Sequence, residues 1–109
     1  MLRTGVDIVH VPRFARLMDN PAFLAKVFHP SEQKKHDAQH LAGLFAAKEA
    51  FFKAIDDGPR WLDIEIKKKA TGRPMIVMTG ALKDAITECD LSISHDHEYA
   101  IAHVVLVTR

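Results

Sequence analysis

Two side chains within one short segment could carry chemistry that an ordinary helix does not need. The segment "LFAAKEAFFKAI", residues 44–55, has the composition of a helix, and Glu49 and Lys53 lie one turn apart on the same face. Burying a carboxylate or an ammonium is costly unless the charge is paired or holds an ion. By itself the spacing is most typical of a surface ion pair, so a functional interpretation needs a further residue.

Asp7 is that further residue. It stands between Val6 and Ile8 in a β run, where Asp is a poor strand former. If Asp7 faces Glu49, the two carboxylates repel each other unless a cation lies between them. Mg²⁺ suits such a pair, because it prefers oxygen ligands and keeps positions for water and substrate phosphates. The alternative is a solvent-facing Asp7 on an edge strand, and the spacing does not decide between the two.

The turn signals along the chain predict the elements that must position these residues. For the first half we predict a strand over 4–11, a helix from Pro12 to about Met18, a helix that begins at Pro21, a further helical start within 29–35, and a long helix from about His40 to Ile55. For the second half we predict a half-buried strand over 61–69 with Leu62, Ile64 and Ile66 on one face, a short strand over 75–78, a helix over 79–89, and two strands within 91–107 that meet at "HDHE". This order predicts an α+β fold in which a mostly antiparallel sheet wraps against the long central helix.

Composition limits the class of protein. The 109 residues are 48% hydrophobic, so we expect residues 1–109 to form a single domain with one core. The formal net charge of +1 favours neither nucleic acid nor an anionic membrane as a partner. No apolar run approaches the ~18 residues of a membrane span, and the single cysteine, Cys89, cannot form an internal disulfide. We therefore expect a cytoplasmic protein.

Two segments carry a resemblance to a known family. "GVDIVHVPRF", residues 5–14, and "FAAKEAFFKAI", residues 45–55, resemble the two signature motifs of the 4'-phosphopantetheinyl transferase superfamily, in particular of its small holo-acyl-carrier-protein synthases. "HPSEQ", "GRP" and "LSISHDHEYAIAHVVL" resemble further segments of that family in the same order. The resemblance therefore covers nearly the whole chain, and its specificity comes from the joint order of the motifs.

The resemblance implies an activity and a set of catalytic residues. It implies the 4'-phosphopantetheinyl transferase fold and the transfer of phosphopantetheine from coenzyme A, the substrate, to a serine of an apo acyl carrier protein. By this resemblance Asp7 and Glu49 bind Mg²⁺ together with the coenzyme A pyrophosphate, and Lys53 holds pyrophosphate oxygens. The proton of the attacking serine could pass to a metal-bound water or to Glu49, and the sequence leaves both open.

The same resemblance implies how the rest of the coenzyme is bound. Gly72, Arg73 and Pro74 are expected to line the adenine pocket, and Ser94 and His95 to hold the 3'-phosphate. Without the resemblance, "GRP" would be an ordinary β turn, and His95 a hairpin histidine bonded to a turn.

The resemblance also implies two partners. Arg13 and Arg16 are expected to bind the acidic carrier protein. A homotrimer is implied as well, with each site joining Asp7, Glu49 and Lys53 of one chain to Arg73, Pro74 and His95 of the next.

The chain departs from the family pattern at three places. Leu44 stands where many relatives have an arginine, "DDGP" at 56–59 replaces a Gly-Thr-Gly loop, and His10 replaces a frequent glutamate. A non-catalytic or altered binding module for coenzyme A or a carrier protein is therefore the alternative function. A hydrolase or zinc site is a further alternative, built from His10, His95, His97 and His103, although no HExxH or paired-cysteine motif supports it.

Overall fold

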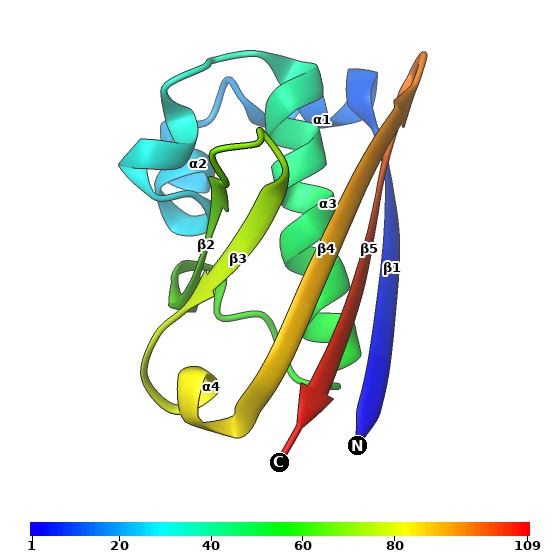
Figure 1. The fold of residues 1–109 in the computed structure, drawn as a ribbon. Helices are drawn as coiled ribbons and strands as arrows, with labels where there is room; N and C mark the ends of the chain where they lie inside the picture. Colours follow the sequence, from blue (N-terminus) through cyan, green and yellow to red (C-terminus); the bar gives the residue numbers. More distant parts are fainter.

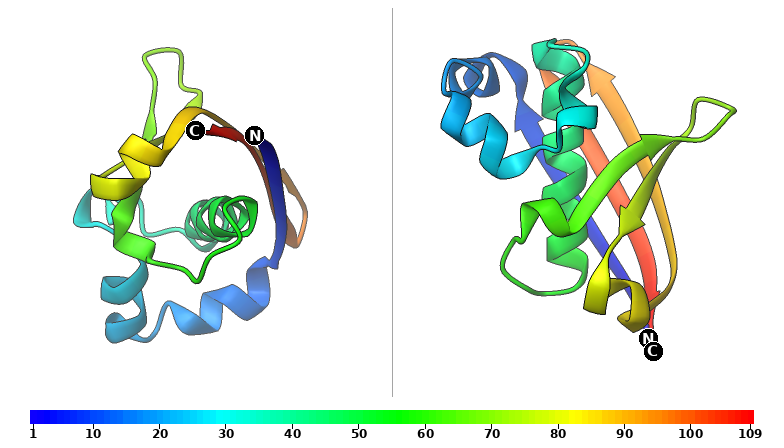
Figure 2. Two further views of the ribbon diagram at one scale, coloured as in Figure 1. Left: turned by 90° about the horizontal axis from the view of Figure 1, so that it is seen from below. Right: turned by 90° about the vertical axis from the view of Figure 1, so that its left-hand side faces the viewer.

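A computed structural model describes residues 1–109 and shows a chain arranged around one long helix. This helix, α3 (Ala38–Ala54), runs through the middle of the molecule, with strands and shorter helices around it (Figures 1 and 2). Asp37 caps its first turn by accepting a hydrogen bond from the His40 N–H. Small residues along the helix, among them Ala42, Ala46 and Ala50, are buried, so neighbouring elements approach its backbone closely.

A three-stranded antiparallel sheet covers one side of α3. Its strands are β1 (Leu2–His10), β5 (Tyr99–Thr108) and β4 (Ile86–Asp96), in the order β1-β5-β4. Asp7 pairs with Ala102, which in turn pairs with Ile93. Since side chains alternate along a strand, Gly5 and Asp7 share the inner face of β1, while Val6 and Ile8 share its outer face.

The remaining elements cover the other sides of α3. The first connection contains α1 (Val11–Leu17), α2 (Pro21–Val27) and the 3₁₀ turn η1 (Pro30–Gln33). The second contains the 3₁₀ turn η2 (Trp61–Asp63), a separate hairpin of β2 (Ile64–Lys68) and β3 (Pro74–Met78), and α4 (Gly80–Ala85). The figures show the hairpin as a second, smaller layer on the side of α3 away from β1 (Figures 1 and 2).

The outer face of the large sheet leaves apolar side chains in solvent. Val6 is 53% exposed and Ile8 62% exposed on β1, and Ile101 is 40% exposed on the neighbouring strand. Isolated exposed apolar residues are ordinary, but these three lie on paired strands and Ile8 is directly opposite Ile101. This face therefore forms an apolar patch that the chain itself does not cover.

The predicted fold class and element order are confirmed, and three details of the prediction were wrong. Leu62 does not face inward in a strand: residues 61–63 form the η2 turn, and Leu62 is exposed. The helix expected over 79–89 ends at Ala85, because Ile86 and the residues after it pair with β5. The antiparallel strands form two sheets rather than one.

None of the helices has the length and apolar character that a membrane-spanning helix needs.

Candidate active site

Gly5 allows α3 to lie directly on β1 beside Asp7. A Cβ atom at Gly5 would collide with the Ala50 carbonyl oxygen and would come within 2.9 Å of the Ala54 nitrogen. Only a residue without a side chain permits this contact. As a result, Asp7, two residues further along the same face, meets the turn of α3 that carries Glu49 and Lys53.

The structure brings Asp7 and Lys53 into direct contact. The Nζ atom of Lys53 donates to Oδ1 of Asp7 at 2.9 Å and to the Val6 carbonyl oxygen at 3.2 Å. The Asp7 side chain is 9% exposed, whereas that of Lys53 is 57% exposed. The second carboxylate oxygen of Asp7, Oδ2, is buried and has no hydrogen-bond partner. Asp7 is therefore not the solvent-facing edge residue of the alternative interpretation.

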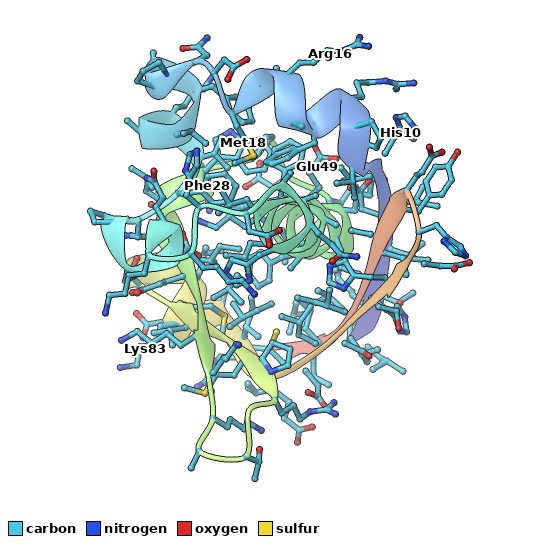
Figure 3. The ribbon with its side chains drawn as sticks, turned by 90° about the horizontal axis from the view of Figure 1, so that it is seen from above. His10, Arg16, Met18, Phe28, Glu49 and Lys83 are labelled. Carbon is cyan, nitrogen blue, oxygen red and sulfur yellow. The ribbon has the colours of Figure 1, made fainter.

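Glu49 completes a pair of carboxyl groups. Burial raises the pKa of Glu49 from its ordinary value of 4.5 to about 7, and the neighbouring Asp7 carboxylate adds to the rise, while Lys53 partly opposes it. Near neutral pH Glu49 therefore exists in both its protonated and its ionised form. Figure 3 shows Glu49 on the side of α3 that faces α1. A carboxyl group in this state can give or take a proton, or bind a cation.

A hollow of about 500 Å³ opens beside this cluster. Its lining is formed by Glu49, Phe52, Lys53, residues 56–59 and Trp61. Arg60 holds the segment in place, because it bonds Asp57 at 2.6 Å and Asp63 at 2.9 Å. The "DDGP" sequence, one of the departures from the family pattern, therefore forms one wall of the candidate site.

A second hollow, of about 770 Å³, lies at the other end of α3. It is lined by Ser31, Glu32, Lys34, Lys35, His40, Gly43, Leu44, residues 65–68, Pro74, Ile93 and His95. His95 reaches the helix because Gly43 has no side chain, and its Nε2 atom is 3.1 Å from the Gln39 carbonyl oxygen. The lysines and histidines give this hollow a basic lining suited to an anion. The two hollows share no lining residue.

The other predicted coenzyme-binding residues lie at or near this second hollow. Gly72 has φ +89° in the β2–β3 turn, a conformation that favours glycine. Arg73, in the same turn, is exposed and bonds Asp90 of β4 at 3.2 Å. Ser94 and His95 are consecutive residues of β4, so their side chains point to opposite faces of the sheet. Of the five predicted residues, Pro74 and His95 line this hollow, whereas Gly72, Arg73 and Ser94 do not.

Arg13 and Arg16 lie away from both hollows. Both are exposed on α1, and Figure 3 shows Arg16 pointing away from the body of the molecule. The histidines of the zinc alternative do not converge: no group of three or more His, Cys, Asp or Glu side chains is arranged to hold a metal ion. The structure therefore gives the zinc alternative no support.

Sequence reasoning missed the ion pair between Lys48 and Glu32. The two side chains are fully buried and 2.8 Å apart. Burial lowers the pKa of Lys48, and the bond to Glu32 opposes this shift. The signal in the sequence is a lysine in α3 whose neighbours three and four residues away are all apolar. Its partner, however, lies 16 residues away in η1. The sequence contains no periodicity that links the two.

Comparison with known proteins extends these observations. The family model described as "4'-phosphopantetheinyl transferase superfamily" matches residues 3–104. The chain belongs to this superfamily. It is 42% identical to a holo-[acyl-carrier-protein] synthase of Geotalea daltonii, over 94% of this chain and 95% of that protein. The resemblance to this family, expected from the sequence motifs, is therefore confirmed.

Solved structures of holo-acyl-carrier-protein synthases have the same fold. The enzyme of Helicobacter pylori, solved in complex with coenzyme A, superposes with a TM-score of 0.89 and 35% identity, covering 95% of this chain and 99% of that one. The enzyme of Neisseria meningitidis superposes with a TM-score of 0.85 and 32% identity, covering 96% and 97%. The likeness therefore extends over whole chains of the superfamily rather than over isolated motifs.

Proposed function

We propose that this chain is a holo-acyl-carrier-protein synthase, which transfers phosphopantetheine from coenzyme A to a serine of an apo acyl carrier protein. The observation that carries the proposal is the cluster of Asp7, Glu49 and Lys53. The two signature segments of the family supply these residues, and the fold brings them together beside a hollow. The relatives bear the name of this activity, and the enzyme of Helicobacter pylori is known with coenzyme A bound.

The carboxyl groups fit a Mg²⁺ ion. Asp7 Oδ2 is a buried oxygen without a partner, and Glu49 is a second carboxyl whose ionisation is disfavoured by burial and by the neighbouring Asp7 charge. Two carboxylates are enough for Mg²⁺, which usually keeps several waters and binds substrate phosphates with its remaining positions. When bound, the ion would neutralise charge on the pyrophosphate as its linkage breaks. Asp7 and Glu49 would hold it.

The protein residues then have distinct roles in the transfer. The serine oxygen forms a bond to the phosphorus that carries the pantetheine, and the bond from this phosphorus to the bridging oxygen breaks. The electron pair leaves with adenosine 3',5'-bisphosphate. Lys53, more than half exposed at the rim of the hollow, can turn from Asp7 to the pyrophosphate oxygens. Glu49 is one acceptor for the serine proton, because it is partly ionised near neutral pH.

The adenosine end of coenzyme A would be bound by the second hollow of a neighbouring subunit. Gly72, Arg73 and Pro74 would line the adenine, and His95, with Ser94, would hold the 3'-phosphate. In support, the basic second hollow and the hollow beside Glu49 have no lining residue in common. The uncovered apolar face of β1 and β5 offers a surface for assembly. We propose a homotrimer with the site shared between chains.

The carrier protein would approach over α1. Arg13 and Arg16 are exposed there, and their charge would attract an acidic partner although the net charge of the chain is only +1. We further propose that residues 1–109 act as one domain in the cytoplasm, where neither nucleic acid nor membrane takes part in the reaction.

Mass spectrometry of an apo carrier protein tests this function. After incubation with the chain, coenzyme A and Mg²⁺, the carrier should gain about 340 Da, the mass of one phosphopantetheine group. Omission of Mg²⁺ should prevent the gain. If several carrier proteins bind but none gains mass, the chain is the altered binding module instead. Leu44 and residues 56–59, the departures that line the two hollows, would then be the first positions to restore.

A further inference from the structure

Lys48 and Glu32 form an ion pair that lies entirely inside the protein. Neither side chain exposes any surface, and the Nζ and Oε1 atoms are 2.8 Å apart. The residues come from different elements, since Lys48 belongs to α3 and Glu32 to η1. A buried ion pair often adds no more stability than a well-packed apolar pair. The reason for this pair must therefore lie in what else it contacts.

Lys48 binds backbone carbonyl groups of three segments. Its ammonium donates to the oxygen of Val27 at 2.8 Å, to that of Trp61 at 3.0 Å and to that of Ile64 at 3.2 Å. These carbonyls lie at the end of α2, in η2 and at the start of β2. An apolar residue would take this donor from all three carbonyls, and only the Ile64 oxygen would keep another contact, to the His29 Nε2 atom at 3.2 Å. Lys48 therefore joins α3 to two connections on its far side.

Glu32 binds backbone N–H groups on the opposite side of the pair. Oε1 accepts from the N–H of His29 at 2.8 Å, and Oε2 accepts from the N–H of Ile66 at 2.7 Å. Each carboxylate oxygen therefore has an N–H partner, and Oε1 also contacts the Lys48 ammonium. Glu32 therefore attaches η1 to the β2–β3 hairpin, and Lys48 attaches this assembly to α3.

The pair lies between the two hollows of the candidate site. Trp61, whose carbonyl Lys48 binds, lines the hollow beside Glu49. Glu32 and Ile66 line the basic hollow. Lys48 also directly precedes Glu49 in the chain, so the contacts that fix the rotation of α3 at Lys48 fix the direction of Glu49 as well.

We propose that Lys48 and Glu32 are positioning residues: together they lock α3, the rim at Trp61 and the β2–β3 hairpin in one arrangement, which sets the shape of both hollows. The proposal rests on the function proposed above. Neither residue needs to touch the reacting atoms. The competing explanation is that the pair only stabilises the fold, in the way that any core residue does.

Steady-state kinetics of Glu32→Gln separates these explanations. The amide has nearly the same volume, but it has one acceptor oxygen for the two N–H groups and no charge for Lys48. We expect kcat/KM to fall at least about tenfold, with kcat lowered and KM for coenzyme A raised, because both hollows shift. The control is Leu106→Ala, which opens a cavity at a buried position of β5 that lines neither hollow. At a temperature well below the unfolding temperatures of both variants, Leu106→Ala should change kcat/KM by less than about twofold.

Trp61 supplies a second measurement that does not depend on activity. It is the one tryptophan of the chain, and its ring stacks on Phe45 with centroids 5.3 Å apart. In Glu32→Gln, acrylamide should quench its fluorescence more strongly than in the wild type, whereas Leu106→Ala should leave the quenching unchanged. If the wild type transfers nothing, the proposed function fails, and the quenching still decides whether the pair positions the rim.

The conservative variant Glu32→Asp covers the case in which Glu32→Gln does not fold. It keeps the charge but shortens the side chain, so it cannot reach both N–H groups and Lys48 at once. We expect it to fold and to show the same combined loss in kcat and KM. If the folded Glu32 variants have kinetics and Trp61 quenching no different from those of Leu106→Ala, the pair is only structural and the proposal is wrong.

Discussion

At the scale of single residues, Glu49 combines two properties that a single variant can test. Its carboxyl is proposed to bind Mg²⁺, and without a metal its ionisation is disfavoured. Glu49→Gln should therefore abolish phosphopantetheine transfer while the protein remains folded, and Asp7→Asn should do the same, because each removes one charge from a two-carboxylate site. The measurement is the Mg²⁺-dependent mass gain of the carrier protein. Full activity in either variant would exclude that residue as a metal ligand.

The stability of metal-free Glu49→Gln should depend on pH in a defined direction. The folded state holds the Glu49 proton up to a pKa of about 7, whereas the unfolded chain releases it near 4.5. In the wild type, the stability from this proton is present below pH 4.5 and is lost as the pH rises to 7. Glutamine does not titrate, so the variant loses no stability over this range. At pH 8 the variant should therefore be more stable than the wild type. The difference should be on the order of 1 kcal/mol, since solvent screening of a half-buried group limits it.

Thermal unfolding at pH 5 and pH 8 checks this sign. The difference in Tm between Glu49→Gln and the wild type should be larger at pH 8. Glu88→Gln, at an exposed position of β4, is the matched control and should show no such difference. A Tm difference for Glu49→Gln that is the same at both pH values would mean that Asp7 and burial do not disfavour its ionisation.

Lys53 should contribute more to coenzyme binding than to carrier binding. Its ammonium is exposed at the rim of the hollow, where it can reach phosphate oxygens. Lys53→Ala should raise the Kd of coenzyme A about tenfold, the effect of one charge-assisted contact. Calorimetry measures this Kd directly, with Lys83→Ala on α4 as a control that removes an exposed lysine elsewhere (Figure 3). Equal affinities of Lys53→Ala and the wild type would exclude the proposed role.

At the scale of elements, the site depends on the close contact of α3 with β1. Gly5→Ala would place a methyl group against the Ala50 carbonyl and force the two elements apart. We expect a loss of about 3 kcal/mol or more in the free energy of unfolding, measured by urea denaturation. Gly58→Ala is the control, because no atom beyond the two adjoining residues lies within 4 Å of its added Cβ. If Gly5→Ala is as stable as Gly58→Ala, the contact does not limit the approach of α3.

Local patterns in the sequence predicted the elements well and the tertiary contacts poorly. Proline and glycine punctuation located the N-terminal helices and the β2–β3 hairpin, and apolar periodicity located α3. The alternation pattern wrongly predicts that the strand includes Leu62, because Leu62 belongs to a 3₁₀ turn that precedes the strand. The local pattern also predicts a helix at Ile86. Ile86 instead pairs with Thr108, a long-range contact that no local pattern can show. The roles of Gly5 and of the Lys48 and Glu32 pair also depend on distant segments, so no local window contains them.

At the scale of the whole molecule, the two halves of the proposed coenzyme site belong to two separate hollows of the chain. The hollow beside Glu49 and the hollow beside His95 have separate linings. Figure 1 shows α3 extending along the length of the molecule; Glu49 and Lys53 belong to its second half, whereas His95 contacts Gln39 and Gly43 in its first half. Under the proposed function, a coenzyme bound at both sets spans two chains, an arrangement that a closed ring of identical subunits would provide.

Mixing two inactive variants tests this shared site. Asp7→Ala chains lack the metal-binding set, and His95→Ala chains lack the phosphate-binding set. After dissociation and reassembly in equal amounts, about a quarter of the sites should join an intact set from each chain, because each neighbour is chosen independently in a cyclic trimer. Transfer should then recover to about a quarter of the wild-type rate.

A mixture of Asp7→Ala and Glu49→Ala chains is the matched control, since both lack the same set and no intact site can form. Subunit exchange is confirmed by mass spectrometry of differently tagged chains. Recovery in the first mixture alone requires a site shared between subunits; exchange without recovery would mean that each chain works by itself, and Asp7 and His95 would then have to act on the coenzyme within a single chain.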